Sequence, residues 1–516
     1  MKATFLLAFI LLLYNFPSIA QNLAKSDTIV PANGNTKLQL EKIKTKKTRL
    51  HSDVIGNEPK KSILIDTTIQ NKYGDLLNND PEYNKRYPLW KSFLGVPGGL
   101  ILTWSFDRYI LKADYSRIGL TTWKGNIKDG WEWDNDRFGI NFIGHPYSGA
   151  FSFNAGRTTG YNFYESFGFS VGGSLLWEYF GENTRPSYND LINTPISGAF
   201  LGEILYRISS NILDDRTRGR ERILREIAAA LIDPKRGFNR LIMGKTKRVT
   251  NKEIYQKEPL NVAIYSGLHR INDESMEFFG KGSSSVMLNI QLDYGNPFEI
   301  RSRKAYDFFK IRGDLSFGVG RKFVDDITGY GILFGKNMQV GKVAILAGGF
   351  QYYDYLDNKT FELGTIGFGG GIFSKLPIGK ETNLYTNLHL AIVPLAGNST
   401  RFGPDTSQLR DYNFGGGFEG KLESTLSLGK HATASLLYYF YMIHTYVGAP
   451  GNNQISILKP RITVRLFRGL SIGAEHFVYL NNRYLTEFPA IHAARTEEKV
   501  FLLLYLEDPQ RRGHYN

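Results

Sequence analysis

Cysteine is absent from the 516-residue chain. Its absence excludes disulfide bonds, thiolate metal sites and cysteine nucleophiles. It also excludes an anchor in which a lipid is attached to a cysteine. Any attachment of this protein to a membrane must therefore come from its fold.

Long apolar segments are also missing. Beyond residue 20 no run approaches the roughly eighteen apolar residues that a membrane-spanning helix needs. The first residues instead combine Lys2, the apolar run Phe5 to Leu13 and the small-residue segment Pro17 to Ala20. This order is typical of a secretory signal peptide that is cleaved before Gln21. We therefore predict that residues 1–20 direct export and that the mature protein has no bundle of inner-membrane helices.

Acidic residues are fewer than basic ones, with 49 Asp and Glu against 63 Lys and Arg, which gives a formal charge of +14. A basic intracellular protein could bind nucleic acid, but the signal peptide argues against that partner. Outer-membrane lipid phosphates, anionic glycans and anionic solutes are the alternatives that suit an exported protein. Simple solubility explains the charge equally well. The sequence identifies no protein partner.

Aromatic residues and glycine are abundant, with 30 Tyr, 35 Phe and 54 Gly, whereas mean hydropathy is only −0.27. A transmembrane β-barrel has this composition because it needs aromatic girdles but only every second residue apolar. From about Leu260 the apolar residues recur with period two, as expected for strands. The clearest segments are Leu288–Tyr294, Phe309–Val319, Leu384–Ile392 and Arg461–Leu466.

We predict an antiparallel outer-membrane barrel of about 12 strands over residues 255–510. Its predicted links alternate in length, as in outer-membrane barrels. Long links are expected at Ile271–Ser284, Ala396–Leu409, Val447–Gln454 and Asn481–Thr496, and short ones at Lys336–Val340, Leu428–His431 and Phe467–Leu470. The link Gly295–Asp307 should be short and is not. Long links face outward, so both ends of the barrel should lie in the periplasm of a Gram-negative bacterium.

Two regions precede the barrel. Residues 21–88 are polar and basic and predict a flexible periplasmic leader. Residues 89–245 predict a small α-helical module on the periplasmic side, which could pack at the barrel mouth, enter the lumen or rest on the inner leaflet. Helices are expected over Tyr161–Phe180, after an N-cap at Ser187, and over Arg220–Ile232. The pairs Gly168/Gly172 and Gly198/Gly202 predict close helix–helix packing.

Four ionisable residues of the helical region are candidates for acid–base chemistry, namely His145, Glu178, Asp190 and Glu203. The alternative is that these acids pair with Arg157, Arg185 and Arg207 and fix the register of the helices. The nine histidines show no metal-ligand spacing. We therefore expect no metal and no cofactor.

Basic residues in both regions are candidates for binding an anionic ligand. In the helical region these are Arg185, Arg207, Arg216 and Arg218, and on inward strand positions Lys310, Arg312, Arg461 and Arg465. The inward set would make the lumen basic. It could also form a salt-bridge network that seals a narrow barrel, with partners Asp293, Asp314, Glu419 and Glu423. We favour the seal, because side chains leave little open bore in a barrel of this size.

Residues of about 140–245 resemble a bacterial envelope family known as domain of unknown function 3943. The resemblance lies in His145-Pro-Tyr-Ser-Gly, Gly172-Gly-Ser-Leu-Leu-Trp-Glu-Tyr, Arg185-Pro-Ser-Tyr-Asn-Asp-Leu-Ile-Asn-Thr-Pro, Leu201-Gly-Glu-Ile-Leu-Tyr-Arg and Asp214-Asp-Arg-Thr-Arg-Gly. It implies an exported envelope protein but no established activity and no catalytic residues.

Three functions are consistent with these features. The main hypothesis is a non-enzymatic barrel that binds or passes a lipid or an anionic solute, or that organises the envelope. The first alternative is a lipid-modifying hydrolase or acyltransferase that uses the helical module. The second is a structural barrel plugged by its helices.

Overall fold

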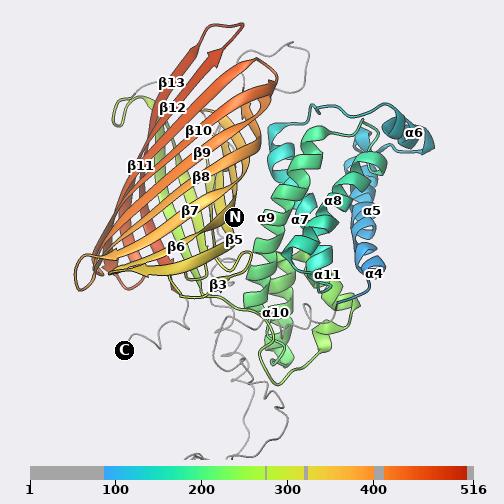
Figure 1. The fold of residues 1–516 in the computed structure, drawn as a ribbon, viewed down its shortest axis with the longest axis horizontal. Helices are drawn as coiled ribbons and strands as arrows, with labels where there is room; N and C mark the ends of the chain where they lie inside the picture. Colours follow the sequence, from blue (N-terminus) through green and yellow to red (C-terminus); the bar gives the residue numbers. More distant parts are fainter. Residues whose placement is uncertain (1–85, 273–275, 319–322, 359, 400–411, 508–516) are drawn as a thin grey trace, which may run out of the picture.

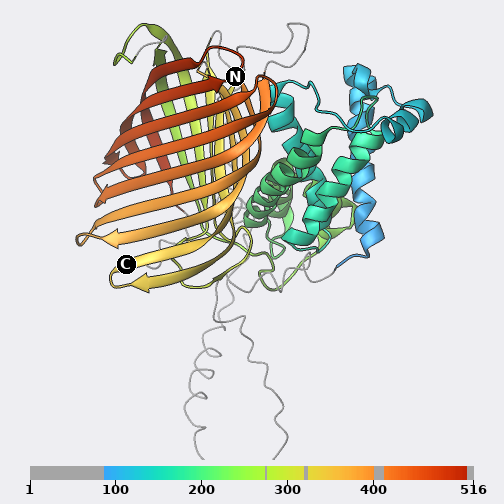
Figure 2. The ribbon, with the colours of Figure 1, turned by 45° about the horizontal axis from the view of Figure 1, so that its top comes forward.

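The computed structural model describes residues 86–272, 276–318, 323–358, 360–399 and 412–507. The predicted signal peptide and nearly all of the predicted leader lie outside these residues. Helices occupy the described chain up to Lys247, and strands follow from Leu260 to Leu506. Figures 1 and 2 show the two parts side by side.

The second part is a closed antiparallel barrel, which confirms the predicted fold class. Twelve strands pair with their neighbours in chain order, and β13 pairs with β1. They are β1 (Leu260–Asn272), β2 (Gly282–Tyr294), β4 (Phe309–Phe317), β5 (Val324–Val340), β6 (Val343–Asp357), β7 (Glu362–Pro377), β8 (Thr382–Ser399), β9 (Tyr412–Leu428), β10 (Ala432–Val447), β11 (Gly451–Phe467), β12 (Leu470–Leu485) and β13 (Ile491–Leu506). The two-residue strand β3 (Ser302–Arg303) pairs only with β5.

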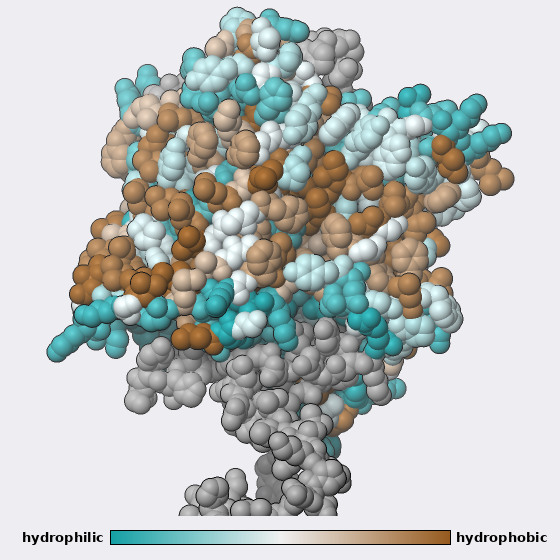
Figure 3. Space-filling model, in the orientation of Figure 1, coloured by the Kyte–Doolittle hydropathy of each residue, from teal (hydrophilic) through white to brown (hydrophobic). Residues whose placement is uncertain are grey.

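Alternation along the strands separates a polar lumen from an apolar outer wall. On β6, Tyr352 and Asp354 point inward, whereas Tyr353 and Tyr355 point outward. On β8, Leu388, Leu390 and Ile392 are exposed on the outer wall. Figure 3 shows such residues as a brown band across the middle of the molecule, with teal residues above and below it. This is the surface pattern of barrels that cross a membrane.

The two rims of the barrel differ less than the sequence suggested. At the rim that holds the ends of the barrel, which we call the turn rim, the segment Lys336–Val340 is not a link but the end of β5, and the turn is Gly341–Lys342. At the opposite rim, the loop rim, β10 and β11 are separated only by residues 448–450, and β12 and β13 by 486–490. The expected long links at Val447–Gln454 and Asn481–Thr496 are therefore wrong, because strand pairing continues through polar inward residues such as Asn481. Part of Ala396–Leu409 lies outside the described residues.

The first part is a layered helical module that runs from α4 to η6. Its α-helices are α4 (Leu89–Phe93), α5 (Gly95–Phe106), α6 (Leu120–Lys128), α7 (His145–Arg157), α8 (Phe163–Phe180), α9 (Tyr188–Ile212), α10 (Gly219–Ile232) and α11 (Pro234–Ile242). Short turns of other helix types are η3 (Asp107–Leu111), η4 (Asp114–Ser116), η5 (Ile140–Gly144) and η6 (Lys245–Lys247). Within the described residues, none of these helices has both the length and the apolar character to span a membrane.

Helix ends follow the sequence signals only in part. Asn162 caps α8 through a reciprocal capping box with Glu165. Ser187 precedes α9 as predicted, but its side chain makes no capping hydrogen bond. Its backbone N–H instead donates to the Glu178 carboxylate at 2.6 Å. A residue of the preceding helix therefore binds the start of α9.

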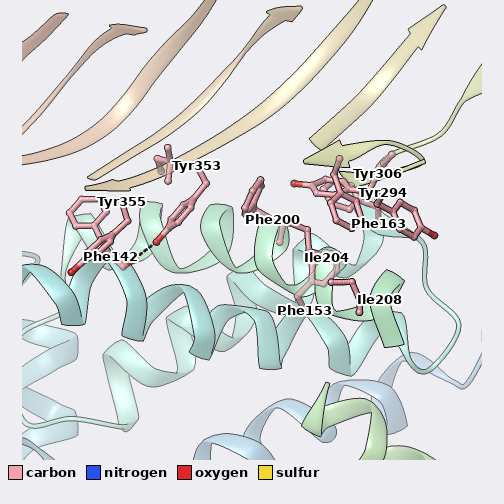
Figure 4. Close-up of a cluster of buried hydrophobic side chains, with 14 of the residues drawn as sticks. Phe142, Phe153, Phe163, Phe200, Ile204, Ile208, Tyr294, Tyr306, Tyr353 and Tyr355 are labelled. Carbon is pink, nitrogen blue, oxygen red and sulfur yellow. Dashed lines mark hydrogen bonds between the residues drawn. The ribbon is translucent and has the colours of Figure 1, made fainter. Parts of the chain in front are cut away.

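The helical module packs on the outer wall of the barrel. Phe200 stacks on Tyr353 with ring centroids 5.4 Å apart, and Phe163 stacks on Tyr306 at 5.2 Å. Figure 4 shows these rings in one cluster between the helices and the strands. Phe142 fits against two glycines of the wall, where a Cβ on Gly364 or Gly397 would lie 2.3 or 2.4 Å from its ring. The outer wall is thus shaped to receive aromatic rings.

Helix α9 follows the wall from one rim to the other. Near its start, Asn189 hydrogen-bonds Asn141, which in turn donates to the hydroxyl of Tyr412, the first residue of β9. Near its end, Asn211 donates to the carbonyl of Glu258, just before β1. None of the three placements considered from the sequence describes this packing. The described helices lie beside the barrel and do not plug its lumen.

Candidate functional site

The first candidate site is a cluster of ionisable groups at the loop rim, beyond the strand ends. His145 begins α7, and its Nε2 lies 3.5 Å from Asp190 Oδ1 and 3.6 Å from Asp136 Oδ2. That nitrogen has no hydrogen-bond partner among the described residues. Asp134 completes the cluster and accepts a hydrogen bond from Asn189 at 2.7 Å. The predicted residues His145, Asp190 and Glu178 thus come from three helices into one electrostatic unit.

The cluster holds more protons than the same groups in water. Burial alone lowers the pKa of His145, but the carboxylates of Asp190, Asp136, Asp134 and Glu178 outweigh it and raise the pKa to about 10. Burial, together with the charge of Asp190, raises the pKa of Glu182 to about 8. His145 is therefore a cation at neutral pH. A protonated imidazole can anchor carboxylates, but it cannot act as a general base.

Once His145 loses its proton, three members of the cluster could also hold a metal ion. Asp134, Asp136 and His145 each offer a ligand atom, and these atoms lie within 4.8 Å of one another. One nitrogen and several carboxylate oxygens suit a divalent cation such as Zn²⁺ or Mn²⁺. The sequence pattern did not predict this group, because two of its members precede His145 on a loop without regular spacing.

The fourth predicted catalytic residue lies elsewhere. Glu203 is fully buried on α9, where Arg157 Nε approaches it at 2.6 Å and Arg207 Nε at 2.8 Å. Arg207 also lies 3.4 Å from Asp307 of the link before β4. The network joins α7, α9 and the barrel, so Glu203 has the contacts expected of a structural ion pair.

The other predicted basic residues of the module are dispersed. Arg185 is half exposed and lies 3.9 Å from Glu132. Arg216 pairs with Asp214 and Glu253 at 2.7 and 3.1 Å. Arg218 is exposed just before α10. The structure therefore does not bring Arg185, Arg207, Arg216 and Arg218 together in a common pocket.

The second candidate site is a chamber in the lumen of the barrel. It has a volume of about 580 Å³ and contains all four predicted inward basic residues among its lining side chains, Lys310, Arg312, Arg461 and Arg465. It also contains Lys421, Lys430 and Arg468, which sequence reasoning missed. Turn residues between β9 and β10 and between β11 and β12 line it as well. The chamber therefore opens at the turn rim.

Ion pairs lie at the inner end of this chamber. Lys310 lies 3.1 Å from Glu423, and Arg312 lies 3.3 Å from Asp314. Arg461 pairs with Glu475 rather than with one of the four predicted acids. Deeper groups continue the network, because Lys499 contacts Asp314 at 3.2 Å and Lys421 contacts Asp354.

Two of the four predicted acids do not pair as expected. Glu419 faces Lys421 at 3.8 Å, and Asp293 accepts a hydrogen bond from Gln291 at 2.9 Å. Arg465 makes no ion pair with any described carboxylate and stays exposed at the chamber mouth, as do Lys430 and Arg468. The chamber thus combines an ion-paired inner end with an exposed mouth at which Lys430, Arg465 and Arg468 outnumber the lining carboxylate of Glu507.

Comparison with known proteins bears on the helical part. Residues 130–235 match the model of the family described as "Domain of unknown function (DUF3943)". This match confirms the resemblance found in the sequence. It contains His145, Glu178, Asp190 and Glu203 but ends before the barrel. A search of curated proteins finds no match to the chain.

Among solved structures the chain is similar to outer-membrane barrels. The outer membrane channel DcaP of Acinetobacter baumannii is 6% identical over 48% of this chain and 96% of its own, with a TM-score of 0.22. The NanC porin is 5% identical over 47% and 98%, with a TM-score of 0.25. An anion-selective porin from Comamonas acidovorans is 8% identical over 48% and 98%, with a TM-score of 0.22. These scores are too low to carry any functional argument.

The proton-holding cluster makes the stability of the helical module dependent on pH. The pKa of His145 and that of Glu182 are both raised in the folded protein. Such groups stabilise the fold at low pH, and this stabilisation is lost as pH rises through about 8 and then about 10. All six tryptophans lie between residues 90 and 177, so their fluorescence reports on the module alone.

We expect the thermal midpoint of the tryptophan signal to fall by about 5 °C or more between pH 5 and pH 9. The variant Glu182→Gln, which has no carboxyl proton to lose, should flatten the part of this fall below pH 8. A midpoint that stays level or rises over this range contradicts the assignment.

Proposed function

We propose that this protein is an outer-membrane barrel that binds an anionic ligand in its basic chamber and does not conduct ions freely. The observation that carries the proposal is the chamber itself. Its volume of about 580 Å³ is that of a small-molecule site, and its mouth presents Lys430, Arg465 and Arg468 without described acidic partners. The apolar outer wall and the closed strand order support the location in an outer membrane.

The orientation of the barrel in the membrane follows from the position of its two ends and the length of its turns. The barrel begins and ends at the turn rim, where the links between β5 and β6 and between β11 and β12 contain only two residues each. Tight turns face the periplasm in outer-membrane barrels. The chamber would then be filled from the periplasm. The loop rim, with the His145 cluster, would face the outside.

Binding is better supported than passage or catalysis. The ion pairs at the chamber floor leave charged side chains in place of an open bore. The carboxylates around His145 raise its pKa to about 10, which leaves it protonated at neutral pH and disfavours it as the general base of a lipid-modifying enzyme. The chamber is therefore the site with the clearest ligand chemistry.

Titration calorimetry with inorganic pyrophosphate tests this proposal on the purified full-length chain. The double variant Arg465→Ala, Arg468→Ala should bind pyrophosphate at least about tenfold more weakly, a loss of about 1.4 kcal/mol. The control Arg185→Ala, Arg218→Ala removes the same charge from the helical module and should bind as the wild type does. Equal affinity in all three proteins contradicts the chamber as the site, and so does a wild type that does not bind.

Planar-bilayer recording tests separately whether the ion-paired side chains at the inner end of the chamber block the passage of ions. The wild-type protein should show no steady conductance, because the floor is closed by side chains. A steady open current in the wild type would contradict the seal, whatever the result of the pyrophosphate titration.

A further inference from the structure

Two helices of the module have the reverse of the polarity found in water-soluble proteins. On α10, Ile223, Ile227 and Leu231 are 59, 53 and 59% exposed, whereas Arg222 and Arg225 are 7 and 3% exposed. Helices of soluble proteins bury the apolar stripe and expose the charged one. Helix α10 has an apolar and a charged face as well, but its apolar face points out.

Helix α11 repeats this arrangement. Phe238, Leu241 and Ile242 are 47, 67 and 68% exposed, whereas Arg236 and Arg240 are 0 and 1% exposed. The buried cations are paired within the module. Arg240 contacts Asp215 at 3.0 Å, and in α10 Arg225 contacts Glu221 at 2.8 Å.

Two further elements of the module have a similar surface. Ile101 and Leu102 of α5 are each 60% exposed, and Ile110 and Leu111 of η3 are 67 and 59% exposed. On α8 the polar residues Ser166, Ser170, Ser174 and Glu178, which recur every four positions, are buried. Polar groups face the interior of the module, and large apolar side chains cover its outside.

The position of the module beside the barrel explains why its helices expose their apolar faces. Helix α9 has 25 residues, which gives a length of about 37 Å, and it reaches from one rim of the barrel to the other. That length matches the roughly 30 Å of a bilayer's hydrocarbon core. Any bilayer that surrounds the barrel on this side meets the helical module before it meets the strands. The brown band in Figure 3 extends from the barrel across the module at the same height.

We propose that the outer surface of the helical module contacts lipid acyl chains, so that the module is embedded in the same membrane as the barrel. In lipid, exposed apolar side chains cost nothing, and the polar groups must pair internally, as they do here. The exposed apolar residues extend over α5, η3, α10 and α11. Lys235 of α11 donates to the Gly95 carbonyl of α5 at 2.7 Å, so these elements are neighbours on the outside of the module. An apolar surface that covers several helices at the height of the barrel's own apolar wall is what a surrounding acyl-chain phase requires.

The absence of cysteine allows a direct test, because each single-cysteine variant carries one reporter. We would attach a fluorophore to Ile227→Cys, Leu241→Cys and Leu102→Cys in the full-length protein, reconstituted in phosphatidylcholine vesicles. Leu390→Cys on the barrel wall is the control for a lipid-facing site. Asn251→Cys is the control for a water-facing site, because Asn251 is exposed in the segment of the chain that connects η6 to β1. Heat-modifiable gel migration confirms that each variant contains a folded barrel.

Lipids brominated on their acyl chains should quench the three module reporters to within about twofold of the Leu390 reporter. The Asn251 reporter should instead be quenched by iodide in the buffer. Module reporters that respond to iodide would place the module in water and overturn the proposal. Reporters shielded from both quenchers would mean that protein covers this surface, which overturns it as well.

Discussion

Replacement of Glu203 by alanine should unfold the helical module while the barrel persists. Glu203 is fully buried and holds two arginines, Arg157 and Arg207, at 2.6 and 2.8 Å. Without it, two guanidinium groups are left in the interior without their main counter-charge. Removal of one partner from a buried ion pair typically costs about 3–5 kcal/mol. That is a large part of the stability of a unit of this size.

Two independent signals separate the module from the barrel in this experiment. Tryptophan fluorescence during urea unfolding reports on the module, since all six tryptophans lie there. Heat-modifiable migration reports on the barrel. The Glu203→Ala midpoint should fall sharply in fluorescence and little in migration. The matched control Glu132→Ala loses only an exposed ion pair, in which Glu132 lies 3.9 Å from Arg185. Its free energy of unfolding should change by less than about 0.5 kcal/mol. If both variants keep the wild-type midpoint, the buried network does not hold the module together.

The barrel was predictable because polar residues that face the lumen and apolar residues that face outward alternate in the sequence of each strand. Residues such as Asn289, Gln291 and Asp293 alternate with apolar ones, and the even strand count follows from the number of alternating segments. The link Gly295–Asp307, too long for a turn, contains β3, which pairs with the part of β5 that extends beyond β4. Turn positions were less predictable, because strand pairing extends past the last apolar residue wherever inward polar groups find partners in the lumen.

The placement of the helical module was not predictable from amphipathicity. The sequence shows that Ile223, Ile227 and Leu231 share one face of a helix, but not whether that face meets protein or lipid. In a water-soluble protein the answer would be protein. The wall residues that receive the module, Tyr353 and Tyr355, look like members of an aromatic girdle. Only the pairing of distant elements shows that they pack against Phe200 and Phe138.

The candidate site was predictable in the same partial way. His145, Glu178 and Asp190 were identified by residue type and do come together, since three helices begin or end at the loop rim. Asp136 and Glu182 lie in connecting segments, where the sequence gives no periodicity to place them. Alternation predicted that Lys310, Arg312, Arg461 and Arg465 point into the lumen, but Lys430 and Arg468 were missed because they lie at turns.

Glycine substitutions provide the second strong prediction, in which two variants change stability in opposite directions. At the crossing of α7 and α9, a Cβ on Gly149 would lie 1.9 Å from the Thr194 carbonyl oxygen, and one on Gly198 would lie 2.5 Å from the Gly149 backbone. The predicted close approach at Gly198 is therefore present. The other predicted pair is wrong at Gly168, where a Cβ would meet no atom within 4 Å.

Gly198→Ala should therefore destabilise the module, because backbone atoms cannot yield as a flexible side chain would. We expect a loss of about 1–3 kcal/mol from overpacking, seen as a lower urea midpoint in tryptophan fluorescence. Gly168→Ala places the same methyl group on α8 in open space. It should raise the free energy of unfolding by about 0.5–1 kcal/mol, and with it the urea midpoint, since alanine favours a helix more than glycine does. The difference in sign distinguishes packing from propensity. Equal shifts for both variants would mean that α7 and α9 do not cross as closely as the structure shows.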